Sequence, residues 1–366
     1  MFRFSLSFLT AIILSANIVL AQGMRPNRLL NDSMAAKIDA EINNYVKDGF
    51  SGNVLVARHN KIILNKMYGN VADLGPNPAF WIASMSKSFT AAAILRLQEQ
   101  GKLSVNDPLS KFFVDVPADK KQITIHNLLN HTSGLPNKYT SDGITEREKS
   151  LKAILDLSLE WKVGEKFLYS SDGYNLLAII VEVASKMSFE KYLRKEILRP
   201  VKLNYTGFWG YEKKTNLAEV ADVKKTKKVD LTIYQTGKSV ANWGYRGPTG
   251  IYSTITDIYK WLMVLEKNKV LNPTSREQLW GKQVLVGKVS PIEEHYYGYG
   301  WGVRFKNDKR YYVRHTGVED WLGHNGVMTL YANGDAYIVL SNAGSQNEST
   351  YWNSFVERTL QKQLQQ

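Results

Sequence analysis

The chain has 366 residues, of which 44% are hydrophobic and 22% are charged. This composition is ordinary for a globular protein and argues against a disordered chain, and the length is enough for one large or two interlocked domains. The chain has no cysteine, which excludes disulfides, thiolate metal sites, a cysteine nucleophile and a lipid-modified cysteine. Its formal net charge of +13 favours anionic surroundings such as cell-wall polymer, lipid headgroups or nucleic acid.

Residues 1–21 have the features of a signal peptide. They carry one charge at Arg3, an apolar stretch over residues 8–20 and a small residue, Ala21, at the exit. We expect cleavage before Gln22 and therefore a secreted or periplasmic protein. The lack of cysteine suits a bacterial periplasm, since the chain would need no disulfides after export. No other run approaches the roughly 20 apolar residues that a membrane span requires.

The first predicted elements after this segment are a helix and a β-hairpin. Apolar residues at helical spacing predict a helix up to about Lys47, for which either Asp32 or Ser33 can serve as the N-terminal cap. Two runs rich in β-formers, residues 52–58 and 61–68, are separated by only two residues and predict a hairpin.

A strong helix is predicted over residues 84–100, where an alanine-rich run carries an apolar stripe and ends at Gly101. Residues 105–265 contain mainly helical patches separated by Pro, Gly and Ser/Asp turns, for example residues 123–129 and 174–185. This middle part is therefore predicted to be a helical subdomain.

The last hundred residues change to strand-like patterns. The predicted strands cover residues 299–305, 311–315, 326–331 and 336–340. Asn333-Gly334 between the last two is a strong signal for a two-residue hairpin turn, and an amphipathic stretch over residues 351–364 predicts a C-terminal helix.

These elements predict an α+β fold, an α/β sandwich. An antiparallel sheet is built from the N- and C-terminal segments and flanked by helices, and a mainly helical subdomain is inserted between them. We expect one catalytic domain over residues 22–366, with a sheet subdomain at about 30–104 and 266–366 and a helical subdomain at about 105–265. A ligand site is expected in the cleft between the two, with the loops 137–150 and 281–299 beside it.

The first candidate for chemistry is Ser84-Met85-Ser86-Lys87, at the start of the strong helix. Ser84 and Lys87 lie one turn apart on one face, so the amine can reach the hydroxyl. The helix N-terminus supplies backbone N–H groups for an oxyanion, and apolar neighbours can lower the pKa of the lysine. This pattern predicts a serine nucleophile with a lysine base. Ser188 and Lys191 have the same spacing, but Ser188 falls between two helical patches with no catalytic pattern around it.

Penicillin-binding enzymes combine Ser-x-x-Lys with a Ser-Asp-Asn element and a Lys-Thr-Gly element, and variants of both occur here in order. The chain thereby resembles the serine β-lactamase superfamily, specifically its class C branch with the related D-alanyl-D-alanine carboxypeptidases and esterases. The resemblance runs from about Phe50 to Asn342. It rests on the stretches WIASMSKSFTAAAILRLQEQGKLSVNDPL from Trp81, TIHNLLNHTSGLP from Thr124, FLYSSDGYNLLAIIVEVAS from Phe167, PTGIYSTITDIYKWL from Pro248 and HTG from His315.

The family's second element is Tyr-x-Asn, which matches Tyr169-Ser170-Ser171. The resemblance implies that Tyr169 is the general base or proton shuttle for the nucleophile. Ser171 departs from the pattern, because a short hydroxyl replaces the amide that holds the lysine and a substrate carbonyl in the family. Two other matches are set aside: Tyr331 ends a strand at a turn, and Tyr139, in Tyr139-Thr140-Ser141, lies in a loop without the surrounding pattern.

The family's third element, Lys-Thr-Gly, corresponds to His315-Thr316-Gly317, as in many carboxypeptidase-like and esterase-like relatives. The resemblance implies that this strand borders the cleft and binds substrate, and that the N–H groups of Ser84 and Val318 are the oxyanion donors. The charge of His315 is expected to depend on pH, so it would hold a carboxylate less firmly than lysine. His324 is a competing candidate, but it falls where the family continues its strand.

His131 is interpreted as a structural residue that pins a loop. His295, His315 and His324 lack the close spacing of a metal site, and neither a cofactor nor a metal is predicted. The basic stretch 213–228 holds six lysines and is interpreted either as a solvated loop or as a patch that docks on an anionic wall or membrane surface. It has no interleaved aromatic residues, so nucleic acid is not expected as a partner.

The sequence therefore predicts an exported, monomeric serine hydrolase that works through a Ser84 acyl-enzyme. The candidate substrates are D-amino-acid peptides of the cell wall, esters or β-lactams. Because of Ser171 and His315, a D-peptidase or esterase is ranked above an efficient β-lactamase. The alternative is a catalytically silent protein that uses the same fold to bind cell-wall fragments.

Overall fold

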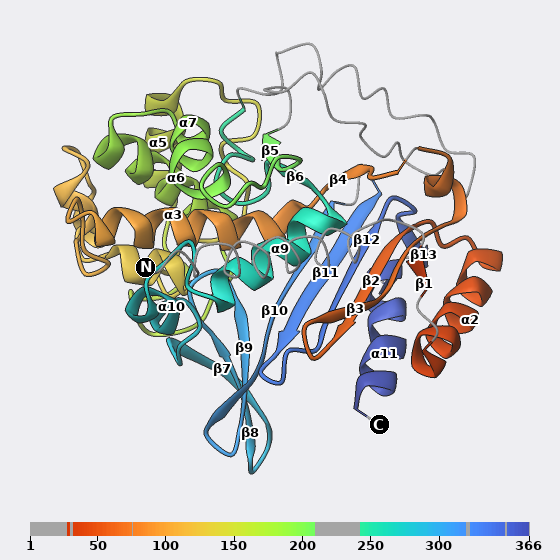
Figure 1. Ribbon diagram of the computed structural model, residues 1–366. Helices are drawn as coiled ribbons and strands as arrows, with labels where there is room; N and C mark the ends of the chain where they lie inside the picture. The colour runs from red at the N-terminus through yellow and green to blue at the C-terminus, as the bar shows by residue number, and fades with distance from the viewer. Residues whose placement is uncertain are drawn as a thin grey trace, which may run out of the picture.

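A nine-stranded antiparallel sheet forms the centre of the protein (Figure 1) in the computed structural model, which describes residues 28–29, 32–74, 76–208, 242–319, 323–347 and 350–365. The strand order is β1-β3-β2-β12-β11-β10-β9-β8-β7, and the sheet is open. The strands are β1 (Arg28–Leu29), β2 (Gly52–Arg58), β3 (Lys61–Tyr68), β7 (Val284–Ser290), β8 (Glu293–Tyr297), β9 (Gly302–Lys306), β10 (Lys309–Glu319), β11 (His324–Tyr331) and β12 (Ala336–Ser341). Since β2 pairs with β12, the predicted sheet of N- and C-terminal segments is confirmed.

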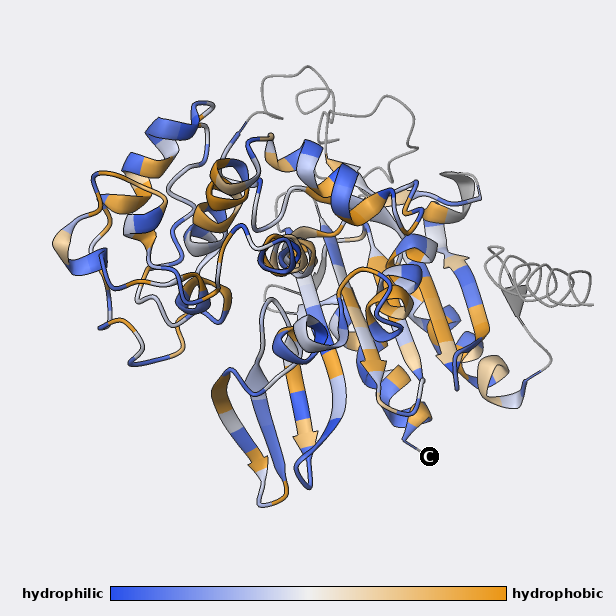
Figure 2. Cartoon of the chain, turned by 60° about the vertical axis from the view of Figure 1, so that its left-hand side comes forward, coloured by the Kyte–Doolittle hydropathy of each residue, from blue (hydrophilic) through white to orange (hydrophobic). Residues whose placement is uncertain are grey.

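Helices cover both faces of this sheet. On one face α2 (Ser33–Lys47) and α11 (Trp352–Leu364) pack against β3, β11 and β12 and against each other. On the other face α9 (Ile255–Glu266) packs on β2 and β12, and its Trp261 stacks on Phe89 of α3 (Lys87–Glu99) at 4.2 Å between ring centroids. Hydrophobic residues run along the central strands between these helices (Figure 2), and they form the two buried clusters of the core.

The remaining elements are α4 (Ile125–Leu129), α5 (Arg147–Leu155), α6 (Ser171–Ser185), α7 (Phe189–Leu193) and α10 (Pro273–Leu279), the small sheet of β4 (Ala79–Trp81), β6 (Ile251–Thr254) and β5 (Gly207–Phe208), and the pair β13 (Ser345–Asn347) and β14 (Thr350–Tyr351). Helices α5, α6, α7 and α10 lie around α3, at the end of the molecule away from α2 (Figure 1). α3 contacts α6 directly, so the helical region and the sheet share the larger buried cluster.

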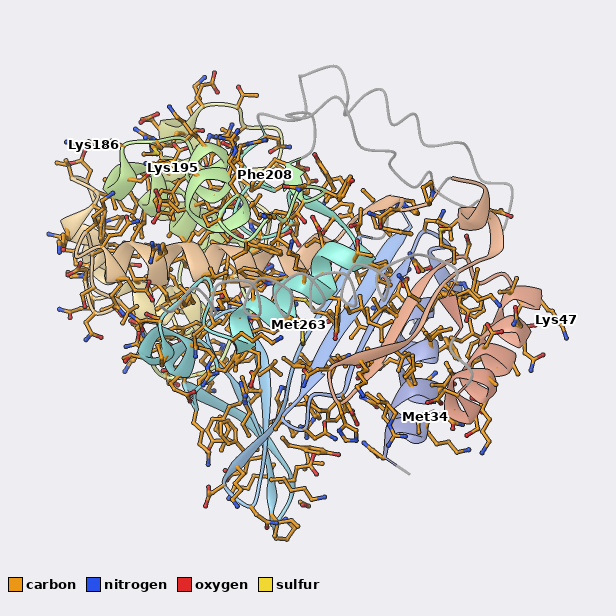
Figure 3. All side chains as sticks on the ribbon, viewed as in Figure 1. Met34, Lys47, Lys186, Lys195, Phe208 and Met263 are labelled. Atoms are coloured by element: carbon orange, nitrogen blue, oxygen red, sulfur yellow. The ribbon has the colours of Figure 1, made fainter. Side chains whose placement is uncertain are left out.

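The first helix begins where the sequence predicted and is capped by Asp32 rather than Ser33. The Asp32 carboxylate accepts hydrogen bonds from the N–H groups of Met34 and Ala35 at 2.9 and 3.1 Å. These are two of the N–H groups that a helix start leaves without a partner inside the helix. Figure 3 labels Met34 and Lys47 at the two ends of α2.

The two hairpins differ in their turns. His59 and Asn60, between β2 and β3, both have positive φ angles of 45° and 63°, as a two-residue turn requires. Between β11 and β12 the turn is longer than predicted, because the Tyr331 N–H donates to the Asp335 carbonyl and residues 332–334 form the loop. Gly334 takes the left-handed conformation there, with φ +85°.

The sequence missed β7 and β8, which it treated as loops beside the cleft. Both strands extend the sheet beyond β9, and β7 is its edge. Leu285 and Val289 of β7 are 44% and 58% exposed, so this strand has no buried face to produce an alternating pattern. β10 is also longer than predicted, since it continues through the polar residues His315 and Thr316 to Glu319.

The predicted signal peptide, its cleavage site before Gln22 and the basic stretch 213–228 lie outside the described residues. In the part of the chain that the structure describes, no helix is long and apolar enough to cross a membrane. The division into sheet and helical subdomains stays a prediction.

Replacement of Asp32 by Ala is expected to lower the free energy of unfolding by about 1 kcal/mol, because two N–H groups at the start of α2 lose their acceptor. Urea denaturation followed by circular dichroism measures this change. Ser33→Ala, at the exposed neighbouring position, is the control and should have little effect. Equal losses in both variants would contradict the assignment of the cap to Asp32.

Candidate active site

Ser84 lies in a one-turn 3-10 helix, Ala83–Ser86, which connects β4 to α3. The α-helix itself begins at Lys87, three residues later than predicted, so Ser84 stands on the turn before the helix. Ala83 has φ +46°, a left-handed conformation that costs a residue with a side chain of the order of 1–3 kcal/mol. Such strain persists only where the surrounding structure holds the turn in place.

β10 provides that restraint through Gly317. A β-carbon on Gly317 would lie 2.1 Å from the carbonyl oxygen of Ile82 and 3.1 Å from the β-carbon of Ala83. The strand therefore lies in direct contact with the backbone that leads into Ser84, and only glycine fits there. Val318, the predicted second oxyanion donor, follows this contact on the same strand and is paired with Asn325 of β11.

Lys87 is completely buried, with 0% of its surface exposed. Its Nζ lies 3.1 Å from Ser84 Oγ, 3.3 Å from Ser171 Oγ and 3.3 Å from the carbonyl oxygen of Pro248. Burial lowers the pKa of the amine from 10.5 to about 7, against a smaller opposing effect of the Glu319 carboxylate. A large fraction of Lys87 is therefore neutral at neutral pH and can accept a proton.

Tyr169 is the third member of the group, and it lines the same pocket as Ser84. Its ring centre is 4.7 Å from Lys87 Nζ. Burial raises the pKa of this phenol well above its usual 10, so Tyr169 is protonated at neutral pH.

His131 holds the segment that carries Tyr169. Its Nδ1 accepts a hydrogen bond from the Ser170 N–H at 3.1 Å, and its carbonyl accepts one from the Leu168 N–H at 2.8 Å. The imidazole also lies against the Tyr169 ring, with centroids 4.3 Å apart. The interpretation of His131 as a residue that pins a loop agrees with these contacts.

Ser171 is the first residue of α6, and Ser170 caps that helix by accepting the Gly173 N–H at 3.1 Å. The Ser171 hydroxyl lies where the sequence placed the family's amide, within reach of Lys87. The N–H of Ser171 donates to Asn137 Oδ1 at 2.8 Å, which ties the start of α6 to the loop after α4.

His315 lies on β10 and is only 6% exposed. Its Nδ1–H donates to the Thr316 carbonyl at 2.6 Å, so Nε2 is the acceptor for the Tyr297 hydroxyl at 3.2 Å. Burial, reinforced by the nearby charge of Lys87, lowers the pKa of His315 to about 3. The expectation that its charge changes with pH was therefore wrong for the neutral range, where His315 is uncharged.

Ser84, Tyr169 and His315 line one pocket of about 370 Å³. Its wall consists of Ser84, Phe167, Tyr169, Val286, His295, Tyr297, Gly302, Arg314, His315, Thr316 and Val318. The guanidinium of Arg314 is engaged by the Glu357 carboxylate at 2.6 and 2.5 Å. The side chains that face the pocket are thus largely neutral or already paired.

Tyr139 was set aside in the sequence, yet its loop is fastened beside Ser171, because the N–H groups of Lys138 and Thr140 donate to the Asp172 carboxylate at 2.8 Å. No pattern in the sequence could reveal this, because the residue lies in an irregular loop. The other residues set aside have structural roles: Ser188 caps α7, His324 Nδ1 accepts the Trp81 N–H, and Tyr331 packs on Tyr311.

The described residues contain no group of three or more His, Asp or Glu side chains that could hold a metal ion. The fold, with Ser84 and Lys87 in contact and the Tyr169 ring beside the Lys87 amine, agrees with the resemblance to the serine β-lactamase superfamily seen in the sequence. The family model described as Beta-lactamase matches residues 38–354, and the chain belongs to this family.

Known proteins agree with this assignment. Protein flp of Staphylococcus aureus is 31% identical over 313 residues, which cover 80% of this chain and 60% of flp. The putative penicillin-binding protein PbpX of Bacillus subtilis is 29% identical over 247 residues, 66% of this chain and 61% of PbpX. The chain thus spans about 60% of the length of these curated relatives.

Solved structures show the same fold at lower sequence identity. A D-amino acid amidase from Ochrobactrum anthropi SV3, complexed with L-phenylalanine amide, superimposes with a TM-score of 0.74 at 20% identity and covers 91% of this chain and 98% of the amidase. The octameric penicillin-binding protein homologue from Pyrococcus abyssi has a TM-score of 0.73 at 24% identity and covers 90% of this chain and 77% of the homologue.

Replacement of Gly317 by Ala is expected to push β10 away from Ile82 and to lower both activity and stability, the latter by about 1–3 kcal/mol. Hydrolysis of an acyl substrate and thermal unfolding measure the two effects. Gly287→Ala on β7 is the matched control, because a β-carbon there meets no atom within 4 Å. Full activity in Gly317→Ala would show that this contact does not position the site.

Proposed function

We propose that the protein hydrolyses acyl substrates through a covalent intermediate on Ser84, with Lys87 as the base. The observation that carries this proposal is the buried Lys87 amine, with Nζ 3.1 Å from Ser84 Oγ and a pKa of about 7. A base with a pKa near the working pH is the most effective one for moving a proton in the neutral range.

The hydrogen bonds around Lys87 support its role as the proton acceptor. A neutral amine has two N–H groups and one lone pair. The Pro248 carbonyl can only accept, and so it takes one N–H at 3.3 Å, while Ser171 Oγ takes the other. The lone pair is left for the hydroxyl proton of Ser84, at 3.1 Å.

The proposed reaction follows from this arrangement. Ser84 Oγ attacks the substrate carbonyl while its proton moves to Lys87, and the N–H groups of Ser84 and Val318 bind the oxygen that becomes negative. Lys87 then returns the proton to the leaving amine or alcohol. A water molecule attacks the acyl-enzyme and gives a proton to Lys87, which passes that proton to Ser84 Oγ as the acid is released. Tyr169, whose pKa is raised, donates a hydrogen bond in these steps and does not act as the base.

We further propose D-amino-acid peptides, amides or esters as substrates, ahead of efficient turnover of β-lactams. Neutral His315 stands where classical members carry lysine, so it brings no positive charge to bind a substrate carboxylate. Ser171 supplies one donor in place of an amide. One structure with this fold is a D-amino acid amidase, which makes D-amino-acid amides the first compounds to test. We also propose that the signal peptide over residues 1–21 directs the protein to the cell envelope. There the protein is proposed to act as a monomer and without a cofactor.

The proposal is tested by the intact mass of the protein during incubation with a penicillin and, separately, by ammonia release from D-phenylalanine amide. We expect hydrolysis of the amide and a slowly released penicillin adduct, and loss of both in Ser84→Ala. Fast penicillin consumption would instead identify an efficient β-lactamase. If the protein forms no adduct and hydrolyses no amide, ester or penicillin, this result would favour a silent protein that binds cell-wall fragments.

The pH dependence of kcat/KM follows from the pKa of Lys87. Because the neutral amine is the reactive form, kcat/KM is expected to rise about tenfold per pH unit below pH 7 and to level off above it. Glu319→Gln should shift this limb to lower pH, because the Glu319 carboxylate raises the pKa of Lys87. A limb that stays in place in this variant, or one that lies near pH 10, would contradict the assignment of Lys87.

A further inference from the structure

The exposed apolar side chains of this protein are concentrated in one hairpin. In the part of the chain that the structure describes, eight large hydrophobic residues are exposed, and four of them lie within residues 285–292: Leu285, Val286, Val289 and Ile292. This segment consists of β7 and the turn that leads into β8. Single exposed apolar residues are common on protein surfaces, but a concentration of them marks a surface that contacts a partner.

Two neighbouring turns form one end of the molecule. The β7–β8 hairpin projects from the body of the protein, at the bottom of Figure 1, and turns at Pro291 and Ile292. The turn between β9 and β10 lies beside it, because the Asn307 N–H donates a hydrogen bond to the Ile292 carbonyl at 2.8 Å. We call this end the hairpin tip and define it as residues 288–294 and 306–309.

The apolar side chains of the hairpin tip have little cover from the rest of the protein. Val289 is 58% exposed and Ile292 is 52% exposed. Ile292 lies in the turn itself, and Val289 lies on β7, which is the edge strand of the sheet. The folded chain thus leaves apolar surface at a projecting end, where a partner can cover it.

Exposed lysines lie around these apolar side chains. Lys288 precedes Val289 on β7, and Lys306 and Lys309 stand on either side of the β9–β10 turn. All three lysines are exposed. Residues 282–310, which contain both hairpins, include six basic and three acidic residues. The excess of positive charge attracts an anionic surface to this end of the protein.

The acidic residues of the hairpin tip are engaged within the protein. The Asp308 carboxylate lies 2.7 Å from Lys282 Nζ, and the Glu293 carboxylate lies 3.5 Å from a guanidinium on β9. The Glu294 carboxylate lies between Lys282 and Lys288, at 3.4 and 3.6 Å. These pairs use the negative charge of the hairpin tip, so the positive charge of the β9–β10 turn is left for an outside partner.

We propose that the hairpin tip docks on an anionic lipid surface. Val289 and Ile292 enter the layer of lipid headgroups, and Lys288, Lys306 and Lys309 bind the phosphates around them. An apolar centre with basic residues beside it fits this partner, because the burial of apolar side chains and the attraction to anionic lipids add to each other.

Two other partners fit the hairpin tip less well. A second copy of the chain would bring the same excess of positive charge to the contact, and this repulsion opposes self-association through the tip. An anionic wall polymer would bind the lysines, but it would leave Val289 and Ile292 in water. The combination of apolar and basic side chains therefore favours lipid.

Docking through the hairpin tip also affects the position of the pocket. Val286, on the same strand, lines the pocket that contains Ser84. A docked hairpin therefore holds this pocket close to the lipid surface. The proposal concerns where the protein binds, so it does not depend on the reaction proposed for Ser84.

The test measures sedimentation of the protein with vesicles made of equal parts phosphatidylglycerol and phosphatidylcholine. All variants begin at Gln22, because the apolar residues 1–21 would bind lipid themselves. We expect binding to these vesicles that weakens with added salt, and weak binding to vesicles of phosphatidylcholine alone. Ile292→Asp is expected to weaken binding at least tenfold, and Lys306→Ala and Lys309→Ala about fivefold each.

Val114→Asp is the matched control. It places the same new charge at an apolar residue that is 97% exposed beside α5, and it should bind vesicles almost as the wild type does. Ile292→Asp is expected to keep the melting temperature of the wild type and its activity on D-phenylalanine amide in solution, because Ile292 is exposed and does not line the pocket.

Three results would overturn the proposal. The first is equal binding of Ile292→Asp and the wild type, which would place lipid binding elsewhere on the protein or leave only attraction by lysines. The second is an equal loss in Val114→Asp, which would make the effect one of net charge. The third is a dimer in light scattering that Ile292→Asp dissociates, which would identify the hairpin tip as a contact between two copies of the chain.

Discussion

The burial of one amine is the constraint on which the proposed chemistry of this protein depends. Lys87 has no exposed surface, and its amine is held between two serine hydroxyls and the Pro248 carbonyl. An ammonium in such a place would lose its hydration, so the neutral form gains relative stability and the pKa falls to about 7. The neutral amine of Lys87 is a base at neutral pH. Its lone pair is free to accept the hydroxyl proton of Ser84.

The architecture serves to hold this arrangement. The two ends of the chain meet as β2 and β12, and the sheet so formed places β10 against the turn before Ser84. The glycine at 317 allows backbone to meet backbone, which keeps the strained turn at Ala83 in place. On the other side, α6 and the segment fixed by His131 present Tyr169 and Ser171 to the same amine. The site therefore needs three separate parts of the chain to be packed together.

The surroundings of the pocket bear on the choice of substrate. His315 is neutral because it is buried, and its ring nitrogens are both used, by the Tyr297 hydroxyl and the Thr316 carbonyl. Arg314 reaches the pocket but is paired with Glu357. In the proposed reaction, a substrate would thus be recognised more by shape and hydrogen bonding than by a fixed positive charge, as expected for the proposed neutral amides and esters.

The sequence by itself determined the order of the main elements, the cap region of α2, the first hairpin and the group of Ser84, Lys87 and Tyr169, because periodicity and short motifs are local. It missed β7, whose exposed edge has no alternating pattern, and it expected a pH-dependent charge on His315, whose pKa burial lowers below the neutral range. Only the tertiary structure placed the loop of Tyr139 beside the start of α6, because an irregular loop has no periodicity and its path is decided by contacts with Asp172 on a helix more than thirty residues away.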